Sequence, residues 1–117
     1  MAKVKRGELV ARPAKKDEYA IYFITTAAAK GWSDALSQFR NAMSDAWDTF
    51  TVAPKDVDGQ RTYVLKYELQ RGTYAGKTYQ RYQYKVSDGA RIWYFADDDL
   101  KRVFLEAVHV GHPKETE

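Results

Sequence analysis

The sequence contains no cysteine among its 117 residues, and it has only two histidines. The absence of cysteine excludes a disulfide scaffold, a zinc site built on thiolates and a cysteine nucleophile. No apolar run approaches the ~20 residues that a membrane-spanning helix needs. The basic N-terminus is not followed by the apolar segment of a secretory signal. We therefore expect a cytoplasmic protein that does not enter a membrane.

Several catalytic signatures are also missing. The sequence has no glycine-rich phosphate loop, no Ser-His-Asp arrangement with a supportive spacing and no carboxylate pair placed for glycoside hydrolysis. The length and the 44% hydrophobic content are enough for one domain with one core. Function must therefore be sought in the distribution of charge and of aromatic side chains.

The net charge of +3 is unevenly distributed. Residues 1–16 hold six basic side chains and one acidic side chain, whereas the rest of the chain has a net charge of −2. Residues 61–91 form a second positive zone, with seven basic and two acidic side chains. Such zones attract polyanions, although ordinary solubilising charge is the competing interpretation. We interpret residues 1–17 as a flexible arm or an extended lead-in, and residues 18–117 as a single domain.

Hydrophobic spacing predicts an α+β fold. Residues 19–24 are aromatic and β-branched, which predicts a short strand buried on both faces. Thr25 or Thr26 can then cap a helical region, which fits one long helix or two helices broken near residues 38–41. From Arg61 onward the period becomes two, which predicts four strands in a meander: residues 61–69, in which Tyr63 and Tyr67 share a face, and residues 78–86, 90–95 and 102–110. The helices should pack on one face of a mostly antiparallel sheet of four to five strands, leaving the other face able to bind something large.

Alternation separates two faces in residues 81–86. Arg81, Gln83 and Lys85 share one face, whereas Tyr82 and Tyr84 share the other and are assigned to the core.

If Asp88-Gly89 forms a tight hairpin turn, Lys85 and Arg91 face each other across the ladder. Like charges in that position destabilise a sheet, so an anion between them would explain the arrangement. Scattered surface charge is the alternative. Trp93, on the face of Arg91, is the best candidate for stacking on an unpaired base.

His109 and His112 are the candidates for proton transfer, because histidine titrates near neutral pH. Two surface histidines at a strand end are the simpler interpretation. A metal site would need a third ligand, for which Glu106 alone has suitable spacing, and we do not expect one.

Two segments resemble the RelE/ParE superfamily of bacterial toxins: residues 89–94 (Gly-Ala-Arg-Ile-Trp-Tyr) and residues 103–113 (Val-Phe-Leu-Glu-Ala-Val-His-Val-Gly-His-Pro). The likeness extends from about Tyr19 to Glu117. It favours two helices, arranged as a helical hairpin. It implies a messenger-RNA endoribonuclease (an mRNA interferase hydrolase) that works without metal or cofactor in the ribosomal decoding site. It also implies a cognate antitoxin as partner.

The resemblance assigns roles to the candidate residues. Arg91 matches the family's central arginine and Lys85 a basic residue of the preceding strand, while His109 or His112 falls near a catalytic position. Gln83 stands where some members have lysine, and Arg81 is placed to contact the RNA backbone. The expected alternatives are a ParE-like inhibitor of DNA gyrase and a non-catalytic member that binds RNA or protein.

Overall fold

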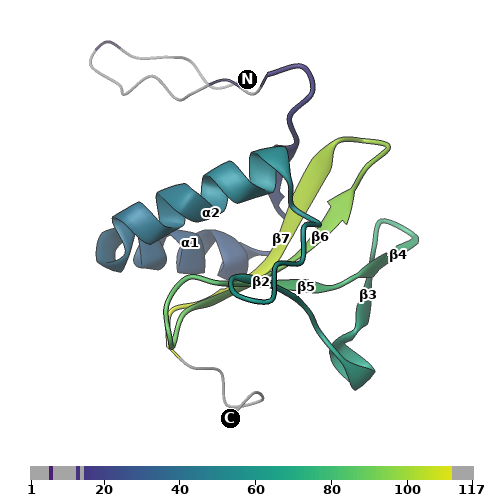
Figure 1. The fold of residues 1–117 in the computed structure, drawn as a ribbon. Coiled ribbons are helices and arrows are strands. Elements are labelled where there is room, and N and C mark those ends of the chain that lie inside the picture. Colours follow the sequence, from purple (N-terminus) through teal and green to yellow (C-terminus); the bar gives the residue numbers. More distant parts are fainter. Residues whose placement is uncertain (1–5, 7–12, 14, 112–117) are drawn as a thin grey trace.

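The computed structural model describes Arg6, Pro13 and residues 15–111, and within them two helices lie on one face of a five-stranded sheet (Figure 1). The sheet order is β1-β7-β6-β5-β2, and a separate hairpin, β3–β4, is inserted in the chain between β2 and β5. The elements are β1 (Ala20–Phe23), α1 (Thr26–Gln38), α2 (Arg40–Val52), β2 (Thr62–Val64), η1 (a 3-10 turn, Tyr67–Leu69), β3 (Arg71–Tyr74), β4 (Lys77–Gln80), β5 (Tyr82–Lys85), β6 (Arg91–Asp97) and β7 (Arg102–His109). The predicted α+β fold is confirmed.

The helical region begins at a side-chain cap and breaks once. The Thr25 hydroxyl oxygen accepts a hydrogen bond of 2.9 Å from the Ala28 N–H, which satisfies one of the unpaired amides of the first turn. Phe39 leaves the helical conformation (φ −135°, ψ 52°), so it ends α1 and precedes α2. The chain therefore has two helices here, as the family resemblance favours.

The helices cover one face of the sheet and build the core against it. The ring of Phe50 in α2 lies 5.5 Å from that of Tyr84 and 4.6 Å from that of Tyr94. Tyr82 and Tyr84 are 7% and 3% exposed, which confirms that they belong to the core. In α1, a Cβ on Gly31 would lie 2.1 Å from the Val108 carbonyl oxygen, so glycine allows the helix to approach β7 this closely.

The strands differ from the sequence expectation in three places. Strand β1 lies at the edge of the sheet of described strands, paired in parallel with β7, and Phe23 is 47% exposed, so the expectation of burial on both faces was wrong. Residues 61–69 were expected to form one strand, but β2 ends at Val64 and the 3-10 turn η1 follows. Residues 78–86 divide at Arg81 into β4 and β5, which belong to different sheets. The edge position of β1 and the insertion of the β3–β4 hairpin depend on contacts between distant segments. Alternation within one segment cannot predict such contacts.

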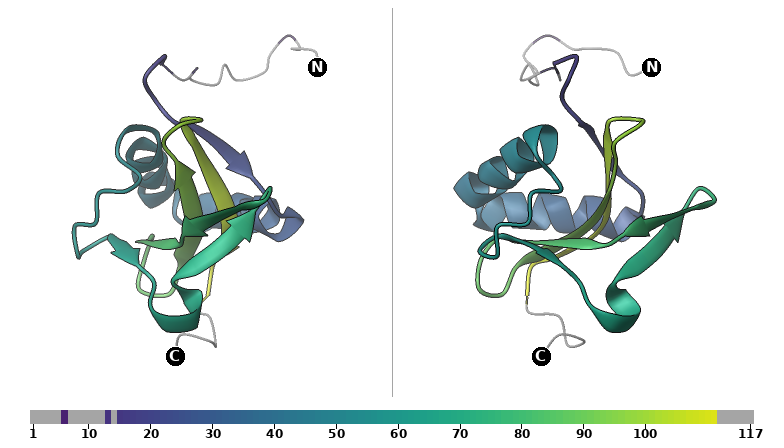
Figure 2. Two further views of the ribbon diagram at one scale, coloured as in Figure 1. Left: turned by 90° about the vertical axis from the view of Figure 1, so that its right-hand side faces the viewer. Right: turned by 45° about the vertical axis from the view of Figure 1, so that its right-hand side comes forward.

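The hairpin β3–β4 covers part of the sheet face that the helices leave uncovered. In the right view of Figure 2 it projects from the side of the sheet away from the helices. Its Tyr79 ring stacks on Phe95 at 5.5 Å and meets Phe104 at 6.0 Å, and a Cβ on Gly72 would lie 2.6 Å from the Phe95 ring. We call the remaining part of this face, which carries Gln83, Lys85, Arg91, Trp93 and His109, the open face. No helix of the described residues is long and apolar enough to cross a membrane.

Candidate functional site

Three polar side chains form a row across adjacent strands of the open face. Lys85 of β5 is the register partner of Arg91 of β6, and Arg91 is the register partner of His109 of β7. Their neighbours in the same strands, Tyr84, Ile92 and Val108, belong to the core cluster on the helix side. Because successive side chains of a strand point to opposite faces, the row lies on the open face. The expected juxtaposition of Lys85 and Arg91 is confirmed, and we call the three residues the polar row.

The guanidinium of Arg91 is half-buried and holds the β5–β6 turn. Its Nη1 donates to the carbonyl oxygens of Ser87 and Ala90, the latter at 3.1 Å. Within the described part of the chain, no carboxylate forms an ion pair with Arg91. The positive charge of Arg91 is therefore fixed in position by carbonyl dipoles without being neutralised, which suits the binding of an anion.

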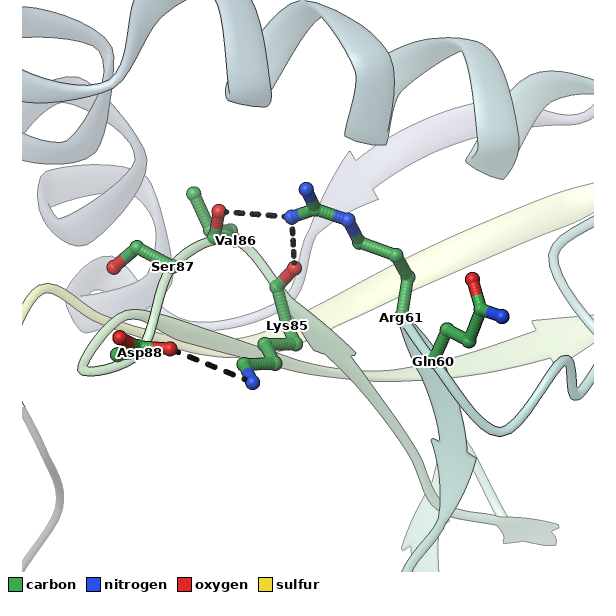
Figure 3. A pocket seen from close by; sticks show the side chains of 6 residues that line it. All are labelled: Gln60, Arg61, Lys85, Val86, Ser87 and Asp88. Carbon is green, nitrogen blue, oxygen red and sulfur yellow. Dashed lines mark hydrogen bonds and ion pairs between the residues drawn. The ribbon is translucent and has the colours of Figure 1, made fainter.

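Lys85 lies at the rim of a cavity of about 280 Å³, whose lining residues are shown in Figure 3. Its Nζ lies 3.5 Å from an Asp88 carboxylate oxygen. The Lys85 side chain is 36% exposed and that of Asp88 is fully exposed, so this ion pair is weak. Arg61 borders the same cavity, and its Nη1 donates to the carbonyl oxygens of Lys85 at 3.0 Å and Val86 at 3.1 Å (Figure 3). Arg61 belongs to the positive zone of the sequence, but nothing in the local pattern singled it out.

Trp93 lies beside the row and is held on two sides. Its indole N–H donates to the Gln83 side-chain oxygen at 2.9 Å, and its ring meets the His109 imidazole edge-on at 5.2 Å. The glutamine that departs from the family's pattern thus orients the tryptophan. The half-buried indole keeps a fixed position next to Arg91.

His109 brings an unsatisfied nitrogen to the site. Its Nε2 is buried and lacks a hydrogen-bond partner among the described residues. Such an atom costs about 1–3 kcal/mol of stability, so folding alone does not explain a histidine here. His112 lies outside the described residues. The described residues also include no group of three histidine or acidic side chains that could hold a metal ion.

Arg81 makes several contacts within the protein. Its Nε and Nη2 donate to the two carboxylate oxygens of Glu106 at 2.6 and 2.8 Å, and the two side chains are 13% and 25% exposed. Its Nη1 donates to the carbonyl oxygens of Leu69 and Arg71, both at 3.1 Å. These contacts give Arg81 a structural role that alternation did not predict. A contact of Arg81 with RNA stays a prediction, and Glu106, the candidate third metal ligand, is bound to this arginine instead.

Glu106 owes its position to a bulge. In β7, Ala107 pairs with Trp93 and Leu105 pairs with Tyr94, so Glu106 is the extra residue between them. A bulge of this kind redirects the side chain of the unpaired residue. The bulge brings the Glu106 carboxylate to Arg81, which is 25 residues away in the sequence. No local sequence pattern connects two residues with this separation.

Neither family models nor curated proteins gave a match to the chain. Among solved structures, the chain is similar to one of the toxin–antitoxin complex RelBE2 from Mycobacterium tuberculosis, with 17% identity and a TM-score of 0.49. The likeness covers 82% of this chain and 99% of the other. At this identity and TM-score the match carries no functional inference, so function rests on the side chains described above.

Proposed function

We propose that the open face binds the phosphodiester backbone of RNA and that the protein is a metal-independent endoribonuclease toxin, neutralised by a cognate antitoxin. The observation that carries this proposal is the polar row. Lys85 and Arg91 are adjacent cations without a strong acidic partner among the described residues, and His109 completes the row. Cations fixed beside a group that can transfer protons are what cleavage of an RNA phosphodiester requires.

The chemistry follows from these groups. The 2′-hydroxyl oxygen attacks the adjacent phosphorus and gives its proton to a general base, while the 5′-oxygen leaves and takes a proton from a general acid. The products are a 2′,3′-cyclic phosphate and a free 5′-hydroxyl. Arg91 and Lys85 stabilise the negative charge that grows on the phosphoryl oxygens. His109 or His112 transfers the protons, and Trp93 stacks on a neighbouring base.

The resemblance adds the expected setting. The RNA is messenger RNA in the ribosomal decoding site, and the antitoxin covers the cationic face with an acidic or helical segment. The proposed location is the cytoplasm.

A non-catalytic binding module is a second candidate, and one observation favours it. The Nη1 of Arg91 is engaged by the β5–β6 turn and the Nε2 of His109 is buried. Both groups would have to move or exchange partners during a reaction. A module that only binds RNA would need the positive charges of Lys85 and Arg91, but it would not need a group that transfers protons.

The test is incubation of purified protein with messenger RNA, with and without ribosomes, in the presence of a chelator. The proposal expects cleavage that continues with the chelator and stops when the 2′-hydroxyl at the cut position is replaced by hydrogen. Binding without cleavage, weakening steeply with salt, would support the binding module. Intact messenger RNA together with loss of DNA gyrase supercoiling would indicate the ParE-like alternative.

A further inference from the structure

Tyr67 is an aromatic side chain whose position folding does not explain. It is 90% exposed, the highest value among the exposed large hydrophobic residues described. Its φ of 57° lies in the left-handed region, which a bulky side chain rarely adopts. An exposed ring gains little from burial, and its backbone is strained. A strained and exposed residue of this kind points to function.

The turn that carries Tyr67 is firmly anchored. Arg81 Nη1 holds the carbonyl oxygens of Leu69 and Arg71, on both sides of Gln70, and its guanidinium is fixed by Glu106. Two backbone hydrogen bonds close the turn itself: Leu69 N–H to the Lys66 carbonyl at 3.2 Å, and Gln70 N–H to the Tyr67 carbonyl at 3.1 Å. The aromatic ring is therefore presented from a fixed backbone.

The turn lies on the same side of the sheet as the polar row. The Arg81 guanidinium that holds it sits 5.5 Å from the centre of the Phe95 ring. Phe95 shares a face of β6 with Arg91 and Trp93, since residues alternate along a strand. In Figure 1 and in the right view of Figure 2, η1 lies below the sheet, on the side away from the helices. The β5–β6 turn lies at the opposite end of β5. The polar row thus lies toward one end of this side of the sheet, and the turn that carries Tyr67 lies toward the other.

The charge around the turn favours a polyanion over a protein surface. Lys66 and Arg71 flank the turn as exposed cations, and Glu68 is the acidic residue between them. Neither cation forms an ion pair with another described residue. An exposed ring beside cations is the combination by which proteins hold unpaired bases, the ring stacking on the base and the cations contacting the phosphates.

We propose that Tyr67 is a stacking platform for an unpaired base of a single-stranded RNA whose phosphate lies on the polar row. This inference rests on the proposed RNA-binding function and deepens it, because it gives the bound strand a second contact and a direction across the open face. Tyr67 touches the RNA away from the reacting phosphate, so it fixes the position of the strand.

The test measures binding of a fluorescent single-stranded RNA that carries 2′-O-methyl groups and so cannot be cleaved. Tyr67→Ala should weaken binding roughly 5- to 150-fold, the loss expected for one base stacked on an aromatic ring. Tyr67→Phe and Tyr67→Trp should retain binding. Tyr22→Ala is the matched control, because Tyr22 is 44% exposed but lies on the edge strand β1. This variant should bind the RNA with wild-type affinity.

An abasic residue moved along the RNA adds a second readout. With wild-type protein, the abasic residue at one position should greatly weaken RNA binding. With Tyr67→Ala, the abasic residue at that position should weaken binding no further, because the effects of removing the ring and removing the base it contacts are not additive. Wild-type affinity for Tyr67→Ala, together with weak binding by Arg91→Ala, would overturn the platform and leave the proposed function intact. Failure of the wild-type protein to bind RNA at all would overturn both. Loss of antitoxin binding alone in Tyr67→Ala would also contradict the platform.

Discussion

Arg81 and Glu106 form a two-point ion pair, with N–O distances of 2.6 and 2.8 Å, between the β4–β5 junction and the bulge of β7. The pair is largely shielded from water. Through Arg81 it connects three segments that are distant in sequence: the turn before β3, the β4–β5 junction and strand β7. It fixes the turn that carries Tyr67, and it engages the carboxylate of Glu106, three residues before His109 in the sequence.

Removal of one partner of this pair should cost stability. Arg81→Ala should lower the free energy of unfolding by about 3 kcal/mol, because it leaves the Glu106 charge uncompensated and two carbonyl groups unpaired. Urea unfolding measures the change. Lys55→Ala is the control, because its pair with Asp98 is 45% and 52% exposed and should contribute about 1 kcal/mol or less. Equal losses in the two variants would contradict the structural role of Arg81.

Gly31 should not tolerate alanine, although alanine is the better helix former. The added Cβ would collide with the Val108 backbone and force α1 away from β7. The loss should be on the order of 2 kcal/mol after the gain in helix propensity. Gly111→Ala is the control, because nothing lies within 4 Å of its added Cβ. Thermal unfolding of both variants checks this, and a stabilised Gly31→Ala protein would contradict the close packing.

Asp97 should make stability depend on acid. Its pKa lies below the ordinary value of 3.8, first because the Leu100 N–H donates to it and then because the Tyr79 hydroxyl does. A lowered native pKa stabilises the fold above the unfolded-state pKa, and this contribution is lost as the pH falls through the native pKa. Free energies of unfolding measured between about pH 2 and 5 should fall more steeply for wild type than for Asp97→Asn. Parallel curves would refute the assignment.

Tyr79 should produce the opposite dependence in alkali. Burial, followed by its hydrogen bond to Asp97, raises the pKa of Tyr79 from 10.0 to about 12. A raised native pKa stabilises the fold below the unfolded-state pKa, and the contribution disappears as the pH rises through the native value. Stability should therefore decline between pH 10 and about pH 12 in wild type and change less in Tyr79→Phe. The same slope in both proteins would count against this contact.

His109 should separate stability from activity. His109→Leu removes the buried nitrogen that has no described partner, so the free energy of unfolding should stay the same or rise by about 1 kcal/mol. RNA cleavage should fall by about 10²- to 10⁴-fold if His109 transfers a proton. His112→Ala, assayed beside it, decides which histidine acts. Full cleavage by His109→Leu and by His112→Ala would remove both from the mechanism.

Local sequence patterns predicted much of the geometry of the candidate site. Alternation assigned Tyr82 and Tyr84 to the core and Lys85 to the opposite face, and the Asp-Gly turn brought Lys85 to Arg91. A strand has a period of two wherever it lies, so these assignments needed no knowledge of the rest of the fold. The Thr25 cap was equally local, because its partner is three residues away.

The remaining features depend on contacts between distant segments. Alternation placed Tyr67 in a strand with Tyr63, but β2 ends at Val64 and Tyr67 is exposed in a turn held by Arg81. The pairing of Arg81 with Glu106 follows from a bulge that has no sequence signature here. Burial of Phe95 by Tyr79 follows from an inserted hairpin that packs back on the sheet. Tertiary packing overrides local preference in each case.

The central claim is that Arg91 stabilises negative charge on a reacting phosphate. The most direct test is the single-turnover rate of RNA cleavage by wild type and Arg91→Ala, with melting temperatures measured on the same samples because Arg91 also holds the β5–β6 turn. The account predicts a rate about 10²- to 10³-fold lower for a variant that remains folded. A folded Arg91→Ala protein that cleaves RNA at the wild-type rate would contradict it.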